Sequence, residues 1–156
     1  MRISLISVGT KMPTWIKEGV AEYSKRIVKT LGFSLYEVPL AHRTKSSKGP
    51  QPMQKEGEAL LAKIQVYDYV IVLEVGGRRM STMAVAERLT AFKSEGKNIV
   101  FLVGGPDGLH PHCRERADEQ WSLSDLTLPH PIVRLVLVEQ LYRANSLLEG
   151  HPYHRG

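Results

Sequence analysis

The sequence predicts an α/β protein in which helices cover both faces of a mostly parallel sheet. Strand-like and helix-like patterns alternate five times along the 156 residues, and the apolar runs among the strands are nearly uninterrupted. A run such as "NIVFLVGG" (98–105) is typical of a parallel strand that lies between two helix layers, because such a strand is buried on both faces. A chain of this length fits one domain with its own core, so residues 1–156 are expected to form a single domain.

The predicted elements follow one another in a regular order. Strands are expected at 2–9, 33–40, 68–77 and 98–105, with a strand or an extended loop at 121–128. Helices are expected at 13–31, 53–65, 81–96, 110–119 and 131–150. Proline opens the first and last helices, where a first turn accepts it, and a glycine pair is expected to end the strand 68–77.

Composition and charge exclude several classes of protein. The 42% hydrophobic and 24% charged residues are typical of an ordinary globular protein. A single cysteine, Cys113, excludes an internal disulfide, and no apolar run is long enough for a signal peptide or a membrane span. We therefore expect a cytoplasmic protein without membrane contact. The net charge of +5 favours, without requiring, a polyanionic partner.

One segment concentrates this positive charge. Residues 42–55, "HRTKSSKGPQPMQK", contain no acid and carry Arg43, Lys45, Lys48 and Lys55. Glycine and prolines make the segment irregular, so it predicts a flexible basic loop that could lie along a phosphate backbone. The alternative is an ordinary solvated surface loop.

Glycines follow two of the predicted strands. In "FLVGGPDGLH" (101–110), small residues at a strand end would let a ligand approach the backbone, although a tight connection without a ligand is the alternative. The spacing fits neither a dinucleotide fingerprint, nor a Walker loop, nor a nucleophile elbow. The run "HPHC" (110–113) lacks further ligands in register, so we expect no metal site and no cysteine nucleophile.

Hydroxyls and leucines alternate in "WSLSDLTL" (121–128). This pattern favours a loop that wraps a small ligand, with leucines against a flat ring and backbone groups at its edges; a partly exposed strand is the alternative. His130 stands between two prolines and is stiffly placed. Glu139 and Arg143 are four residues apart, so they can pair on one face of the last helix.

Four motifs together resemble the RlmH family of pseudouridine N3-methyltransferases, which act on 23S ribosomal RNA and belong to the SPOUT superfamily. They are "SVGTKMPTW", "LVGGPDGL", "WSLSDLTLPHPIVRLVLVEQLYRA" and "HPYHR", in this order and spacing. The resemblance implies an α/β trefoil knot at the C-terminal part of the sheet. It also implies a homodimer, with the helix 131–149 in the interface, that reads its RNA within the assembled ribosome.

The resemblance also implies that S-adenosylmethionine binds in the knotted loops. The residues that match these loops, together with His130, are Leu73, Gly77, Gly104, Gly105, Gly108, Leu123, Ser124, Asp125, Leu126, Thr127, Leu128 and His130. In the matching family the C-terminus folds over the cofactor. We therefore expect His154 or Tyr153 to assist deprotonation of the base and Arg155 to hold a phosphate or the developing anion. The alternative is a tail that only packs on the surface.

Two other functions remain open at this stage. The chain could be a SPOUT-like methyltransferase for another ribosomal base or for tRNA, or a non-catalytic RNA-binding module with the same fold. Methylation assays on ribosomes and on tRNA distinguish the first alternative from a 23S pseudouridine methyltransferase. Binding of the methyl donor distinguishes an enzyme from the non-catalytic module.

Overall fold

A computed structural model describes residues 1–43 and 51–155 and contains one five-stranded sheet. The strands are β1 (Ile3–Val8), β2 (Phe33–Val38), β3 (Tyr69–Arg79), β4 (Ile99–Val103) and β5 (Glu119–Ser122). Their order across the sheet is β2-β1-β4-β3-β5, and every neighbouring pair is parallel. The predicted α/β class with a parallel sheet is therefore confirmed.

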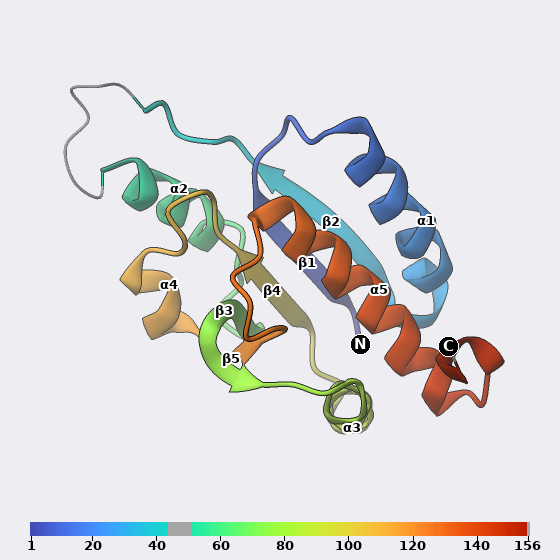
Figure 1. Cartoon of the computed structure of the whole chain (residues 1–156). Coiled ribbons are helices and arrows are strands. Elements are labelled where there is room, and N and C mark those ends of the chain that lie inside the picture. The colour runs from blue at the N-terminus through green and yellow to red at the C-terminus, as the bar shows by residue number, and fades with distance from the viewer. Residues whose placement is uncertain (44–50, 156) are drawn as a thin grey trace.

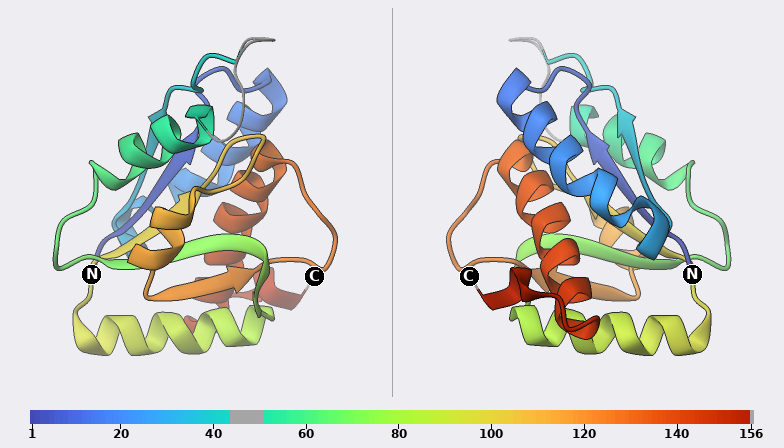
Figure 2. Two further views of the ribbon diagram at one scale, coloured as in Figure 1. Left: turned by 90° about the vertical axis from the view of Figure 1, so that its left-hand side faces the viewer. Right: turned by 90° about the vertical axis from the view of Figure 1, so that its right-hand side faces the viewer.

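Helices cover both faces of this sheet (Figures 1 and 2). One face carries α1 (Thr14–Leu31), α3 (Thr82–Glu95) and α5 (His130–Leu148). The other face carries the shorter α2 (Gln51–Leu61) and α4 (Pro111–Arg116). Among the described residues, no helix is both long enough and apolar enough to span a membrane.

The sheet separates two apolar clusters because side chains alternate along each strand. On β1, Leu5 points to the cluster beneath α1, α3 and α5, whereas Ile6 points to the smaller cluster beneath α2 and α4. All five residues of β4 are buried, which explains its uninterrupted apolar run.

β3 differs from its prediction, since it does not end at its glycines but continues to Arg79. Its pairing with β5 shifts between Leu73 and Arg78, both of which lie opposite Trp121. A Cβ atom on Gly77 would lie 2.7 Å from the backbone carbon of Trp121, so only glycine fits this close approach. The glycine pair therefore marks an irregularity within the strand rather than its end.

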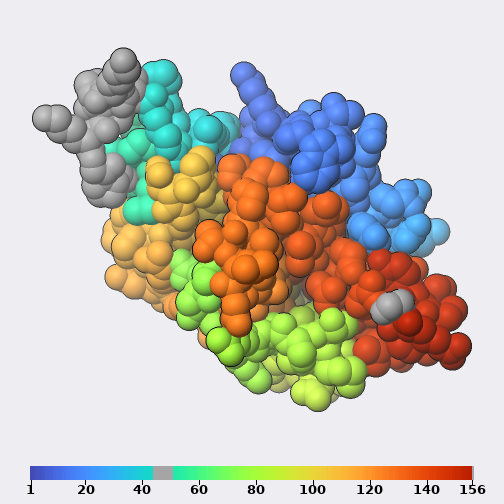
Figure 3. Space-filling model, in the orientation of Figure 1, coloured from blue at the N-terminus to red at the C-terminus, as the bar shows by residue number. Residues whose placement is uncertain are grey.

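The segment 121–128 divides into two parts. β5 ends at Ser122, and the residues that follow form a loop leading to α5. This loop and the first turn of α5 lie on the surface, next to the loop that follows β4 (Figure 3).

Only part of the predicted basic loop can be compared with the structure, because 44–50 lie outside the described residues. Residues 51–55 belong to α2 rather than to an irregular loop, and Pro52 fits there because the first turn of a helix needs no amide hydrogen bond. Lys55 is exposed on this helix.

Candidate functional site

A cavity of about 830 Å³ lies beyond the carboxyl ends of β4 and β5 and against the middle of β3. Its wall comes from residues 73–75, from the loop after β4, from the loop after β5 and from the start of α5. The carboxyl edge of a parallel sheet is the usual place for a ligand, and this volume suits a ligand the size of a nucleoside derivative.

Arg134 fixes the end of α5 that borders the cavity. Its side chain is 2% exposed and pairs with Glu37 at 2.5 Å. It also donates to Ser7 Oγ at 2.9 Å and to the carbonyl oxygen of Gly9 at 3.2 Å. His130 lies one helical turn earlier, so the buried pair that anchors α5 to β1 and β2 also positions His130 at the cavity.

The environment of His130 favours its neutral form. Burial lowers the pKa of the imidazole, and the positive charges of Arg134 and Arg43 lower it further, against a smaller opposing effect from Glu56. The imidazole is therefore uncharged at neutral pH, which avoids repulsion with a cationic ligand in the cavity.

The glycines of the loop after β4 allow two stretches of backbone to come into close contact. A Cβ atom on Gly104 would lie 2.6 Å from the backbone carbon and oxygen of Gly108, and Gly108 has a positive φ of 84°. Gly105 and Gly108 form an isolated antiparallel bridge. These glycines thus build a tight turn in which the backbone folds on itself, and this turn is also one wall of the cavity.

An ion-pair cluster supports the same turn from outside. Glu56 is 2% exposed and accepts hydrogen bonds from Arg43 Nη1 at 2.8 Å and from the backbone N–H of Ala41 at 3.0 Å. Arg43 also pairs with Asp107, at 3.0 Å. Arg43, which was expected to reach out toward phosphate, is instead held between a buried carboxylate and the turn.

Hydroxyl groups shape the loop after β5. Ser122 Oγ donates to the carbonyl oxygen of Ser124 at 2.8 Å, and the backbone N–H of Leu126 donates to Ser124 Oγ at 2.9 Å. Leu126 is 72% exposed although it borders the cavity, so a bound ligand would remove apolar surface from water there. Asp125 pairs with Arg79 at 2.8 Å, and both side chains are exposed.

The structure brings most of the predicted cofactor residues together at the cavity. Those that line it are Leu73, Gly104, Gly105, Gly108, Leu123, Ser124, Leu126, Thr127, Leu128 and His130. Gly77 and Asp125 do not line it. Among the lining residues that the sequence did not single out is Glu74, which pairs with Arg114 at 2.5 Å. Its position between Leu73 and Gly77, which both match the cofactor loops of the family, was the only sequence signal for it.

The C-terminal tail lies elsewhere in the chain. It forms a short 3-10 helix, Pro152–Arg155, beside the end of α5 that is remote from the cavity (Figure 1). At 1.5 Å per residue, the 19 residues of α5 separate the two by about 27 Å. Within one chain the tail therefore does not fold over the cavity, and Tyr153, His154 and Arg155 do not line it.

Aromatic contacts hold the tail in this place. Tyr153 Oη lies 3.2 Å from Tyr23 Oη, and its ring centre lies 4.5 Å from that of Tyr142. The Arg143 guanidinium, which pairs with Glu139, stacks 4.8 Å from the Tyr153 ring. Burial and the hydrogen bond with Tyr23 raise the pKa of Tyr153 to about 12, so its phenol is protonated at neutral pH.

Other kinds of chemistry find no support in the described part of the chain. Burial raises the pKa of the Cys113 thiol to about 11, which disfavours a thiolate nucleophile. His110 Nδ1 accepts a hydrogen bond from the backbone N–H of His112. No three His, Cys, Asp or Glu side chains among the described residues are grouped so that they could hold a metal ion.

A family model described as "Predicted SPOUT methyltransferase" matches residues 1–154. The chain belongs to the SPOUT methyltransferase family. The knot-class fold expected from the sequence is thereby confirmed, as is the expectation of a methyltransferase.

Named relatives and a solved structure agree with this membership. "Ribosomal RNA large subunit methyltransferase H" from Marinomonas sp. (strain MWYL1) is 49% identical over 155 residues, covering 99% of this chain and 100% of the relative. The protein of the same name from Hahella chejuensis is 47% identical, covering 99% of each. The crystal structure of a tRNA methyltransferase from Aquifex aeolicus matches with a TM-score of 0.55 at 15% identity, covering 92% of this chain and 70% of that one. This last likeness shows a shared fold.

Proposed function

We propose that this SPOUT methyltransferase uses S-adenosylmethionine to methylate N3 of a pseudouridine in 23S ribosomal RNA, within the assembled ribosome in the cytoplasm. The observation that carries the proposal is near-half identity, along the whole chain, to relatives named for methylation of large-subunit ribosomal RNA. The cavity at the strand ends supports it with a site of suitable size.

The cavity fits S-adenosylmethionine, which supplies an electrophilic methyl group when bound. Leu73, Leu123 and Leu126 would pack against its adenine ring, and backbone groups of the turn 104–108 would contact its edges. The Glu74 carboxylate lines the cavity and would accept hydrogen bonds from ribose hydroxyls or the ammonium group. Neutral His130 adds no positive charge beside the sulfonium.

The active unit in this proposal is a homodimer. Because the cavity lies at the start of α5 and the tail lies at its end, antiparallel pairing of two α5 helices would bring the tail of one protomer to the cavity of the other. Half-buried apolar side chains on α5, including Ile132, Val133 and Val136, would be covered in such an interface. This arrangement reconciles a catalytic tail with its distance from the cavity of its own chain.

The tail supplies the groups that the reaction requires. The attacking nitrogen carries a proton, and a positioned base that removes it contributes about 10²–10⁴-fold to the rate. Among the described residues, His154 Nδ1 is buried without a hydrogen-bond partner in its own chain, so the imidazole would turn outward before this nitrogen meets a group of the RNA. Arg155 is exposed and would hold a phosphate or the developing anion.

Ribosomes whose 23S RNA contains its pseudouridines but lacks this methyl group provide the direct test of this function. We expect the purified protein to transfer one methyl group from S-adenosylmethionine to a pseudouridine of 23S RNA in such ribosomes, located by mass mapping. Methylation of tRNA or of another base instead would replace the proposed substrate. The absence of any thermal stabilisation by S-adenosylmethionine would favour a non-catalytic RNA-binding module.

Cofactor binding should weaken as the pH falls from neutral into the acidic range in which His130 gains a proton. The pKa of His130 lies below its ordinary value of about 6.5, so the imidazole stays neutral through neutral pH and becomes charged only under more acidic conditions. Its positive charge would then repel the sulfonium, with Arg134 and Arg43 already nearby. Calorimetry of S-adenosylmethionine binding at several pH values checks this, and His130→Gln should remove most of the dependence. An unchanged pH profile in the variant would contradict it.

A further inference from the structure

A second cavity, of about 280 Å³, lies at the opposite edge of the sheet. It is bordered by the amino-terminal parts of β1 and β4 and by Tyr36 of β2, on the face that carries α2, and α2 ends at Leu61. The length of a strand, about 3.3 Å per residue, separates this edge from the first cavity.

Two tyrosines are exposed at this cavity. Tyr67 is 72% exposed and Tyr36 is 48% exposed, which leaves aromatic surface in water. The ammonium group of Lys63 lies 5.9 Å from the centre of the Tyr36 ring, and the exposed Arg2 is a second cation at the cavity. Aromatic faces with cations beside them are the combination that binds stacked bases and their phosphates.

The remaining groups match the edge of a nucleobase. Gln65, Asn98 and Ser4 offer side-chain donors and acceptors. The Asp68 carboxylate is the one acidic group among the lining residues, and it accepts a hydrogen bond from the backbone N–H of Gln65 at 2.8 Å. The negative charge of Asp68 would repel a phosphate placed directly beside it. Its oxygens can, however, accept hydrogen bonds from the N–H groups of a base.

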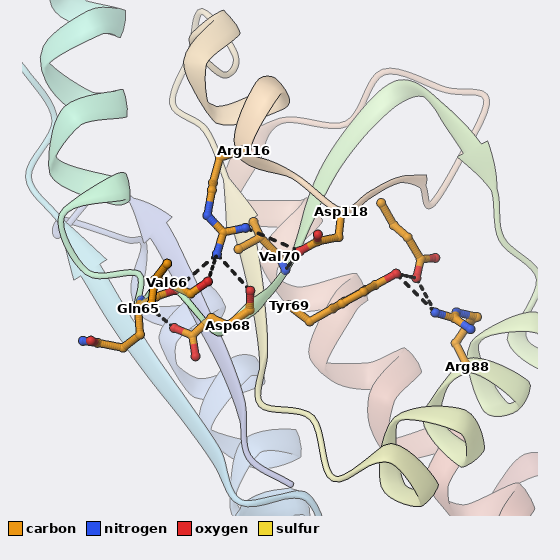
Figure 4. Close-up of polar contacts among 9 residues, drawn as sticks. Gln65, Val66, Asp68, Tyr69, Val70, Arg88, Arg116 and Asp118 are labelled. Carbon is orange, nitrogen blue, oxygen red and sulfur yellow. Dashed lines mark hydrogen bonds and ion pairs between the residues drawn. The ribbon is translucent and has the colours of Figure 1, made fainter.

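Arg116 holds the loop that carries Tyr67 (Figure 4). Its Nη2 donates to the carbonyl oxygens of Asp68 at 2.9 Å and Gln65 at 3.2 Å. Asp118, which lies beside Arg116, accepts a hydrogen bond from the backbone N–H of Val70 at 2.8 Å and fixes the start of β3. A loop that is ordered before binding loses little conformational entropy when it binds.

We propose that this second cavity binds one unstacked nucleotide of single-stranded RNA. Tyr67 stacks on the base, and Lys63 and Arg2 contact the phosphates. Both cations are exposed at the surface, where a strand can continue in either direction, so the site suits a polynucleotide rather than an enclosed free nucleotide. The choice of RNA as the polyanion rests on the proposed function.

Binding of a fluorescein-labelled oligouridylate, measured by anisotropy, tests the site without any methyl transfer. We expect Tyr67→Ala to weaken binding about tenfold, and Tyr67→Phe to bind like the original chain because the ring is kept. Lys63→Glu should reduce the slope of log affinity against log salt by at least about one. Lys29→Glu is the matched control, since Lys29 is equally a surface lysine but lies on α1, across the sheet.

Wild-type affinity in Tyr67→Ala, with an unchanged melting temperature in every variant, would overturn the proposal. Competition by uridine monophosphate as strong as that by the oligomer would also overturn it, in favour of a free-nucleotide site. This binding test can succeed or fail independently of the test of the proposed methyl transfer. Loss of binding in Tyr67→Ala supports the site even if ribosomes are not methylated, and ribosome methylation cannot rescue the site if binding is insensitive to Tyr67.

Discussion

Gly104→Ala is expected to lower the free energy of unfolding by about 2–3 kcal/mol and to abolish measurable binding of S-adenosylmethionine. The added Cβ atom would lie 2.6 Å from backbone atoms of Gly108, and a backbone cannot rotate aside as a side chain can. The turn 104–108 would have to open, which moves one wall of the cavity. Urea unfolding and calorimetry measure the two effects.

Gly76→Ala is the matched control for this substitution. A Cβ atom on Gly76 meets nothing within 4 Å, and Gly76 is not among the glycines with positive φ. The control should keep its unfolding midpoint and its cofactor affinity. If Gly104→Ala behaves in the same way, the turn is more adaptable than its backbone contacts indicate.

The fold was predictable because its strongest signals are local. β4 is buried at every position, so its sequence is apolar throughout, and the helices repeat apolar residues at their own period. The extent of β3 was not predictable in the same way. The close approach of Gly77 to Trp121 depends on a strand 44 positions later in the chain, and a glycine pair alone resembles a strand end.

The candidate site shows the same division. Loop segments that line the cavity are short and distinctive, so most of the residues could be named from the sequence. Ion pairs between distant segments could not be predicted from the sequence. Arg134 and Glu37 are 97 residues apart, and Arg43 and Asp107 are 64 residues apart. The second cavity also escaped prediction, because residues from separate strands and one loop form it without any motif.

Removal of the tail after Glu149 is expected to reduce methyl transfer to ribosomes by at least about 100-fold. The described tail makes its contacts with Tyr23, Tyr142 and Arg143, all of which remain in the shortened chain, so the sheet and the cavity should persist. Circular dichroism and thermal melting check that the fold is kept. Normal methylation by a folded, shortened chain would exclude a catalytic role for the tail.

Point variants distinguish the groups within the tail. Tyr153→Phe keeps the ring that packs on Tyr142 and removes a hydroxyl that is already protonated at neutral pH, because its pKa is about 12. We expect this variant to lose less activity than His154→Ala if His154 is the base. A greater loss in Tyr153→Phe would assign the proton transfer to the tyrosine instead.

Mixed dimers reveal which cavity the tail serves. The shortened chain retains a cavity but no tail, and a Leu126→Arg chain retains its tail but places a cation in the mouth of its cavity, at a position exposed enough to keep the fold. Random pairing of equal amounts makes half of the dimers mixed, each with one complete site if the tail crosses to the partner. Activity should then recover to about a quarter of that of the intact enzyme. A tail that serves its own chain leaves every dimer with no complete site, so the mixture would remain inactive.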